Sequence, residues 1–184
     1  MQGIVRKVQQ IMKEDELILV DIHDNPIGSM GKLETHVKSR LHRAFSVFLY
    51  HDNKILIQKR ALDKYHSGGL WANTCCSHPR LGEKLEDAVK RRLMQEVGVE
   101  CETKEIFSFV YHADYPDGLC EYEYDHVFVG EYNGSYKPDP EEILTMKWID
   151  IEELEKDLLD HPKDYAKWFL IAAPKVIEWI VQKS

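Results

Sequence analysis

Two strand-like segments separated by three polar residues constrain the fold of this chain more than any other feature. Residues 44–50 (AFSVFLY) and 54–60 (KILIQKR) flank the sequence His51-Asp52-Asn53. Two short runs of this kind, joined by a few turn-forming residues, are typical of a β-hairpin. The core of the protein is therefore expected to include an antiparallel pair of strands.

Strand and helix patterns are mixed along the rest of the chain without a strict β-α-β order. Further strands are predicted at 17–22, 71–77, 107–113, 121–131 and 146–149, with a turn at 24–26 after the first of them. Helices are predicted at 84–98, ending at Gly98, and at 165–182, where Pro174 should kink or interrupt the helix, and helical periodicity is weaker at 4–14. Together these elements predict an α/β (α+β) fold in which helices sandwich a mixed β-sheet.

Length, composition and charge limit the class of protein. With 184 residues, 43% of them hydrophobic and 30% charged, the chain is expected to form one globular domain over 1–184, with 1–15 as a peripheral N-terminal segment. A net charge of −8 argues against a general nucleic-acid or acidic-membrane binder. No apolar run approaches the ~18 residues of a membrane span, and the first residues lack the apolar core of a signal peptide. We therefore expect a cytoplasmic protein with reduced cysteines.

Three carboxylates are expected on one face of the strand at 121–131. Glu121, Glu123 and Asp125 are spaced two residues apart, so their side chains point the same way. Neighbouring anions repel one another unless they are solvated or share a cation. An exposed strand face is the commoner explanation for such a row taken alone, and a cation site is the alternative.

A thiol and an imidazole are expected to share one face of the strand at 71–77. Cys76 and His78 are two residues apart, whereas Cys75 should face the opposite side, toward the core. Cysteine is among the most buried residue types, so a packing role is the ordinary explanation for Cys76. A catalytic thiol beside an imidazole is the alternative.

Histidines and basic residues elsewhere could complete a site for a metal ion and an anion. His36, His42 and His78, with the two glutamates, would nearly fill an octahedron around a Zn, Mn or Fe ion, although their spacing is not a known local motif. Candidate ligands of a phosphate group are Lys32, Arg60, Lys64 and Arg92. The ordinary role of such basic residues is surface solvation, and that of Trp168, on an apolar stripe, is core packing.

Five segments in order along the chain resemble type I isopentenyl diphosphate isomerase, which belongs to the Nudix superfamily. They are Leu41–Ser46, Thr74–Pro79, Glu121–Glu123, Pro138–Ile143 and Trp168–Phe169, and the resemblance covers roughly residues 17–180. It implies a Nudix-like mixed sheet flanked by helices and an enzyme that interconverts isopentenyl and dimethylallyl diphosphate in isoprenoid biosynthesis. The expected partner is a small prenyl diphosphate rather than nucleic acid or a membrane, and the expected state is a monomer or weak homodimer.

The resemblance also implies roles for individual residues. The catalytic groups would be Cys76 and Glu123, with Tyr111 bonded to the glutamate and Trp168 over the developing cation. The ligands of an ion such as Mn²⁺ or Zn²⁺ would be His36, His42, His78, Glu121 and Glu123. A Mg²⁺ ion on the substrate diphosphate would be held by Glu96 and the backbone carbonyl of Cys76. Contacts to the substrate would come from Lys32, Arg60, Lys64, Ser77 and Arg92.

A changed Nudix box separates this interpretation from two alternatives. The box keeps Glu83 and Glu96, but Arg92 and Gln95 replace two acidic residues. A Nudix pyrophosphohydrolase acting on a nucleotide or prenyl diphosphate uses that acidic cluster to gather metal ions around the attacking water, so the changed box argues against hydrolysis. A non-catalytic regulator that binds diphosphate or metal would have no need of the paired thiol and carboxylate.

Overall fold

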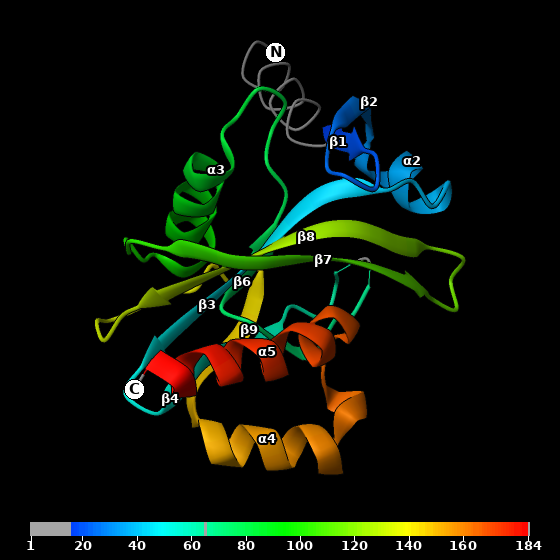
Figure 1. Ribbon diagram of the computed structural model, residues 1–184. Coiled ribbons are helices and arrows are strands. Elements are labelled where there is room, and N and C mark those ends of the chain that lie inside the picture. Colours follow the sequence, from blue (N-terminus) through cyan, green and yellow to red (C-terminus); the bar gives the residue numbers. More distant parts are fainter. Residues whose placement is uncertain (1–15, 65, 184) are drawn as a thin grey trace, which may run out of the picture.

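One sheet of nine strands forms the centre of the part of the chain described by the computed structural model, residues 16–64 and 66–183 (Figure 1). The strands are β1 (Glu16–Val20), β2 (Pro26–Gly31), β3 (His42–His51), β4 (Lys54–Arg60), β5 (Trp71–Ala72), β6 (Cys75–Ser77), β7 (Lys104–Asp114), β8 (Cys120–Glu131) and β9 (Ile143–Asp150). The predicted hairpin is β3–β4, whose strands are antiparallel. β3 and β8 run parallel, so the sheet is mixed. The helical periodicity at 4–14 lies outside the described residues.

Helices cover both faces of this sheet. They are α2 (Lys32–Val37), α3 (Leu85–Arg92), α4 (Ile151–Asp160) and α5 (Lys167–Lys183). α3 lies on one side of the sheet, and α4 and α5 lie on the other (Figure 1). The predicted mixed sheet between helices is therefore confirmed. Among the described helices, none combines the length and the apolar character that a bilayer span requires.

Two apolar clusters form on opposite faces because side chains alternate along the central strand β3. Phe45 and Val47 pack with α3, whereas Phe48 packs with α5. The Phe48 ring stacks on that of Phe169 at 5.6 Å between centroids. Burial of such side chains stabilises the attachment of each helix by about 1.5–3 kcal/mol per side chain.

The strand register brings distant segments to one end of the sheet. His42 lies opposite Glu123 in the parallel β3–β8 pair, and Tyr111 of β7 lies opposite the same glutamate on its other side. Ser46 lies opposite Cys76 of β6. The candidate site is therefore assembled by strand pairing between residues far apart in the sequence.

The predicted strand at 71–77 is two short strands, β5 and β6, separated by the buried residues Asn73 and Thr74. Thr74 Oγ1 donates to the Leu56 carbonyl at 2.6 Å and accepts from the Leu49 amide at 2.8 Å. Side-chain hydrogen bonds thus replace the backbone ladder at this point, which strand periodicity cannot reveal.

Both predicted helices exist but differ in detail. The first is α-helical through Arg92 and continues as a π-helical turn, Leu93–Val97, before Gly98 ends it at φ = 67°. Glycine is favoured at this position for two reasons. Its φ is positive, and a Cβ atom at Gly98 would lie 3.0 Å from the Lys137 carbonyl oxygen. The second helix, α5, continues through Pro174 without the interruption that the proline suggested.

Besides the 3-10 turn Pro162–Asp164, three elements of the described chain have no counterpart among the sequence predictions. α2 has six residues, too few for helical periodicity to show, yet it carries His36. β2 begins at Pro26, at the expected turn, and is largely exposed, so it lacks an apolar alternation. α4 carries many acidic residues, but Ile151, Leu154 and Leu158 recur at helical spacing and pack against the core, so the sequence contains a helical pattern here that the predicted elements do not include.

Candidate active site

A cavity of about 220 Å³ lies where β3, β4, β6 and β8 meet α3 and α5. Most of the predicted site residues line it: Lys32, Arg60, Lys64, Cys76, Ser77, His78, Arg92, Glu96, Glu121, Glu123 and Trp168. The other three, His36, His42 and Tyr111, are buried. His42 and Tyr111 reach the site through Glu123. The fold thus collects the predicted set in one place.

The carboxylate row of β8 faces the interior of the protein. Glu121, Glu123 and Asp125 are 2%, 7% and 1% exposed, so this face is not a solvated strand surface. Asp125 Oδ2 accepts a hydrogen bond from Ser46 Oγ at 2.8 Å. Buried carboxylates require partners, and those of the two glutamates are imidazoles and tyrosine hydroxyl groups.

Three histidines surround Glu123. His78 Nε2 lies 3.1 Å and His42 Nε2 lies 3.4 Å from Glu123 Oε1. Donor atoms of His36, His42 and Glu123 all lie within 4.8 Å of one another. Because metal–ligand bonds to nitrogen and oxygen are about 2.0–2.2 Å long, ligand atoms at these separations can share one ion.

Hydrogen bonding leaves two of these imidazoles ready to bind a metal. His36 Nδ1 donates to the Lys32 carbonyl at 2.7 Å, and His42 Nδ1 donates to the Arg40 carbonyl at 2.9 Å. Their Nε2 atoms are buried and have no hydrogen-bond partner among the described residues. A backbone carbonyl on one ring nitrogen is the usual partner of a histidine that binds metal through the other. Burial lowers the pKa of His36, and it lowers that of His78 to about 3, so both rings are in the neutral form that a metal requires.

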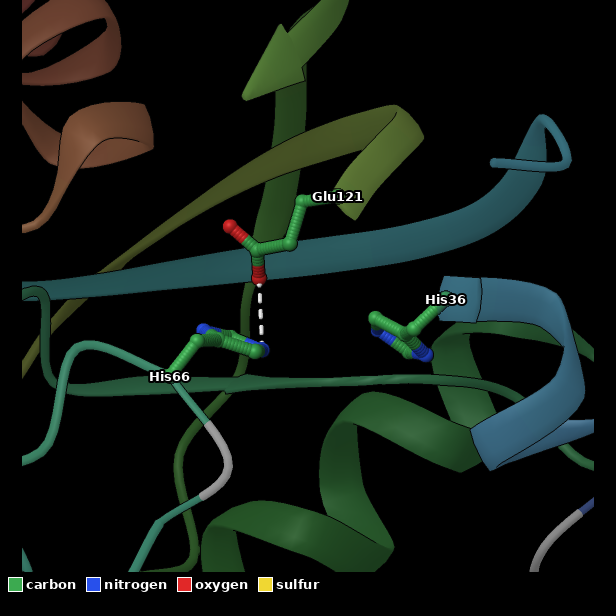
Figure 2. Close-up of side chains that lie close together, drawn as sticks. All are labelled: His36, His66 and Glu121. Carbon is green, nitrogen blue, oxygen red and sulfur yellow. Dashed lines mark ion pairs between the residues drawn. The ribbon is translucent and has the colours of Figure 1, made fainter. Parts of the chain in front are cut away.

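Two further residues contact Glu121 and are absent from the predicted set. His66 Nε2 lies 2.8 Å from Glu121 Oε1, and Tyr115 OH donates to Oε2 at 2.7 Å. Figure 2 shows His66, His36 and Glu121 converging from three separate segments. A signal for His66 exists in the sequence, because it follows Lys64 by two residues in the same loop, and binding residues often cluster in loops.

Cys75 and Cys76 face opposite sides of β6, as predicted. Cys75 is buried in the apolar cluster under α3, whereas Cys76 lines the cavity. Burial raises the pKa of Cys76 to about 12, although Arg60, whose guanidinium donates to the sulfur at 3.4 Å, opposes the rise. Cys76 is therefore a protonated thiol at neutral pH.

Glu123 has the opposite protonation state. Burial alone would raise its pKa, but the adjacent imidazoles of His42 and His78 hold the pKa of Glu123 well below its ordinary value. Tyr111 OH donates to Glu123 Oε2 at 2.7 Å, and burial raises the pKa of that phenol well above its ordinary value. The cavity thus contains a proton donor and a proton acceptor whose environments push their pKa values apart.

Four basic side chains line the cavity, and two of them pair with glutamates; the four are Lys32, Arg60, Lys64 and Arg92. The Lys64 ammonium pairs with Glu142, and Arg92 Nε donates to Glu96 Oε1 at 2.8 Å. Burial, followed by the neighbouring charge of Lys64, lowers the pKa of Lys32. Cations held this close repel one another, so an anion such as a diphosphate would stabilise the group.

Trp168 lies at the cavity wall rather than in the apolar core alone. It is 3% exposed, and its Nε1 donates to Asn73 Oδ1 at 2.9 Å. The Arg60 guanidinium lies over the indole, 5.1 Å from the ring centroid. The ring therefore already contacts one cation through its π face.

The remaining carboxylates of the Nudix box are neutralised by arginines. Both oxygens of Glu83 accept from Arg91, at 2.7 and 2.8 Å, and Glu96 pairs with Arg92. Gln95 Oε1 accepts from Arg91 at 3.3 Å. Neither Glu83 nor Glu96 is therefore a free carboxylate.

Comparison with known proteins shows the family of the chain. The family described as NUDIX domain matches residues 40–169. The chain is 47% identical over 165 residues to Isopentenyl-diphosphate Delta-isomerase 2 of Aromatoleum aromaticum, covering 89% of this chain and 87% of that protein. It is 50% identical over 158 residues to Isopentenyl-diphosphate Delta-isomerase 2 of Photorhabdus laumondii, covering 85% and 89%.

Solved structures share the fold at lower identity. The crystal structure of DR0079 from Deinococcus radiodurans aligns with a TM-score of 0.65 at 20% identity, covering 79% of this chain and 90% of that one. A MutT NUDIX hydrolase from Burkholderia pseudomallei aligns with a TM-score of 0.59 at 19% identity, covering 72% and 95%. At these identities the likeness concerns the fold alone.

Proposed function

We propose a chemical mechanism from one premise: the chain belongs to the Nudix family and, within it, to the isopentenyl-diphosphate Delta-isomerases. Its reaction is the interconversion of isopentenyl and dimethylallyl diphosphate, a step of isoprenoid biosynthesis. The observation that supports the mechanism is the pairing of a protonated Cys76 with an ionised Glu123 in one cavity.

The reaction needs two groups in opposite protonation states. Moving the double bond adds a proton at one carbon and removes another two carbons away, and because an alkene is a very weak base the intermediate is a tertiary carbocation. One group must donate and the other must accept. Cys76 and Glu123 supply these functions, and after one turnover their protonation states are exchanged, which is the starting state for the opposite direction.

The four basic side chains orient the substrate by its diphosphate, with Ser77 beside them. Charge-assisted bonds from Arg60, Lys64 and Arg92 would place the five-carbon chain between the thiol and the carboxylate. Water must be excluded from around the five-carbon chain, because a water molecule would otherwise add to the carbocation. The indole face of Trp168 stabilises that cation by ~2 kcal/mol, which corresponds to a factor of ~30 in rate.

The chain offers ligands for divalent ions at two places. His36, His42, His78, Glu121 and Glu123 would hold Mn²⁺ or Zn²⁺, and the buried Nε2 atoms of His36 and His42, which make no hydrogen bond with the described residues, fit this assignment. Glu96 and the Cys76 carbonyl would hold Mg²⁺ with the diphosphate. A bound divalent ion supplies positive charge beside Glu123 and so adjusts its affinity for a proton. Tyr111 orients that carboxylate through its 2.7 Å hydrogen bond.

The mechanism is tested by incubating the protein with isopentenyl diphosphate and Mg²⁺ in D₂O and following the substrate by NMR. Deuterium should enter the five-carbon skeleton as dimethylallyl diphosphate forms, with no release of phosphate. Glu123→Gln should abolish both deuterium incorporation and the formation of dimethylallyl diphosphate. Phosphate release without deuterium incorporation would instead identify a pyrophosphohydrolase.

A further inference from the structure

His66 lies in the active site without a role in the mechanism above. It belongs to the connection between β4 and β5, and its side chain is 10% exposed. Its Nε2 atom lies 2.8 Å from Glu121 Oε1. A histidine this well buried against a carboxylate is a candidate for a specific function.

Aromatic neighbours hold the His66 ring in place. Tyr115 stacks on it at 5.2 Å between centroids with 26° between the planes, and Trp168 meets it edge-on at 6.0 Å. Tyr115 also donates to the second oxygen of Glu121 at 2.7 Å. His66 Nδ1 has no hydrogen-bond partner among the described residues, so the direction of the ring is set by Glu121 and these stacking contacts.

A third group points into the same space. The ring of His36 stacks with that of His66 at 5.8 Å and 24°, and its buried Nε2 lacks a hydrogen-bond partner in the described part of the chain. Donor atoms of His36, His66 and Glu121 all lie within 4.8 Å of one another. Figure 2 shows the three side chains gathered in one region, with the Glu121 carboxylate directed at the His66 ring, to which the dashed ion pair joins it.

An ion pair between His66 and Glu121 does not account for this arrangement. It would satisfy those two residues and leave His36 Nε2 buried and unpaired, which is costly. A divalent ion would bind all three donors at once. His36 is also within 4.8 Å of the donors of His42 and Glu123, so the two groups adjoin through one shared imidazole.

We propose that His66 is a ligand of the divalent ion in the His/Glu site, which then has four imidazoles, from His36, His42, His66 and His78, and two carboxylates. Six protein ligands fill an octahedron. The inference rests on the proposed function only in placing an ion at this site. It adds a ligand that contacts Glu121, whereas His42 and His78 contact Glu123.

The test counts the imidazole nitrogens bound to the ion. The full-length protein is loaded with Mn²⁺ and studied by pulsed EPR, which detects nitrogen nuclei coordinated to the metal. Wild type should show four bound imidazoles, and His66→Gln, which retains a hydrogen-bond donor for Glu121, should show three. The matched control is His51→Gln, because His51 lies at the far end of β3 and is 38% exposed; it should show four.

Affinity gives a second readout. His66→Ala should weaken Mn²⁺ binding at least ~10-fold in a chelator competition, and His66→Gln should not restore it. Three bound imidazoles in both wild type and His66→Gln, or no Mn²⁺ binding at all, would overturn the proposal. Deuterium incorporation by wild type tests the proposed function separately. An active enzyme with three bound imidazoles would refute only the role of His66. An inactive enzyme would refute the mechanism, whatever the number of imidazoles bound to Mn²⁺.

Discussion

Cys75 and Cys76 are chemically identical neighbours on β6, yet the fold places them in different regions. Cys75 is completely buried with the apolar side chains under α3, where its thiol donates to Glu96 Oε2 at 3.5 Å. Cys76 faces the cavity and contacts Arg60. The difference shows that the pleat of the strand, rather than the residue type, decides which thiol meets the substrate.

The largest expected difference between the two cysteines is in turnover. Cys76→Ala should lose ~10²–10⁴ in kcat because it removes a positioned proton donor or acceptor. Cys75→Ala should retain turnover and lose about 0.5–1.5 kcal/mol of stability, as for removal of one methyl-sized group from a core. Steady-state kinetics and urea unfolding measure the two effects.

An epoxide analogue of the substrate provides a control for this comparison. It should alkylate Cys76, as read by peptide mass spectrometry, and leave Cys75 unmodified. Equal loss of activity in both variants, or labelling of Cys75, would show that the two faces of β6 have been assigned the wrong way round.

Only substitutions on the side of the sheet that faces the cavity should lower the metal content of the protein. His78→Ala and Glu121→Gln remove ligands on that face, and each should lower affinity for a divalent ion by at least ~10–100-fold. Cys75→Ala should bind the ion like wild type because its side chain lies across the strand. Elemental analysis of the purified variants measures this, and full stoichiometric metal in His78→Ala and Glu121→Gln would contradict the proposed site.

Arg92 connects the two regions, since it pairs with Glu96, the neighbour of Cys75, and also lines the cavity. The double variant Arg92→Glu/Gln95→Glu restores the two acidic residues of the Nudix box in the sequence. It should nevertheless raise KM about 10–100-fold, because a charge-assisted contact to the diphosphate is worth about 1.5–3 kcal/mol. Phosphate release by this double variant with an unchanged KM would show that α3 still supports hydrolysis.

The smallest expected effect is a pH dependence of stability. Burial raises the pKa of Cys76 from 9.0 to about 12. The folded state therefore binds this proton more tightly than the unfolded state, so the stabilisation is complete below pH 9 and is lost as pH rises toward 12. The free energy of unfolding of wild type relative to Cys76→Ala should begin to decline above about pH 9 and continue to fall toward about pH 12. A difference independent of pH would mean that the pKa of Cys76 is the same in the folded and unfolded states, and a difference that grew with pH would mean that the folded pKa is lowered.

Much of the fold could be predicted from the sequence, but several boundaries could not. The β3–β4 hairpin and α5 have strong apolar patterns of their own. The π-helical turn at Leu93–Val97 and the division of the strand at 71–77 depend on contacts with other segments, such as the hydrogen bonds of Thr74 to two neighbouring strands. α2 is too short to leave a pattern.

By itself, the sequence determined which side chains share a face. A period of two residues places Glu121 with Glu123 and separates Cys76 from Cys75, because side chains alternate along any strand. Five ordered segments resembling one enzyme family identified the chemistry. None of this requires knowledge of which strands are neighbours.

Only the tertiary structure decided which residues from different segments meet. The parallel register of β3 and β8 sets His42 opposite Glu123, and the β4–β5 connection brings His66 to Glu121. Such contacts arise from strand pairing and loop closure between distant parts of the chain, so they leave no local periodicity. That is the physical reason why two glutamates could be placed on one face from the sequence, whereas the histidine and tyrosine that hold Glu121 became apparent only in the folded protein.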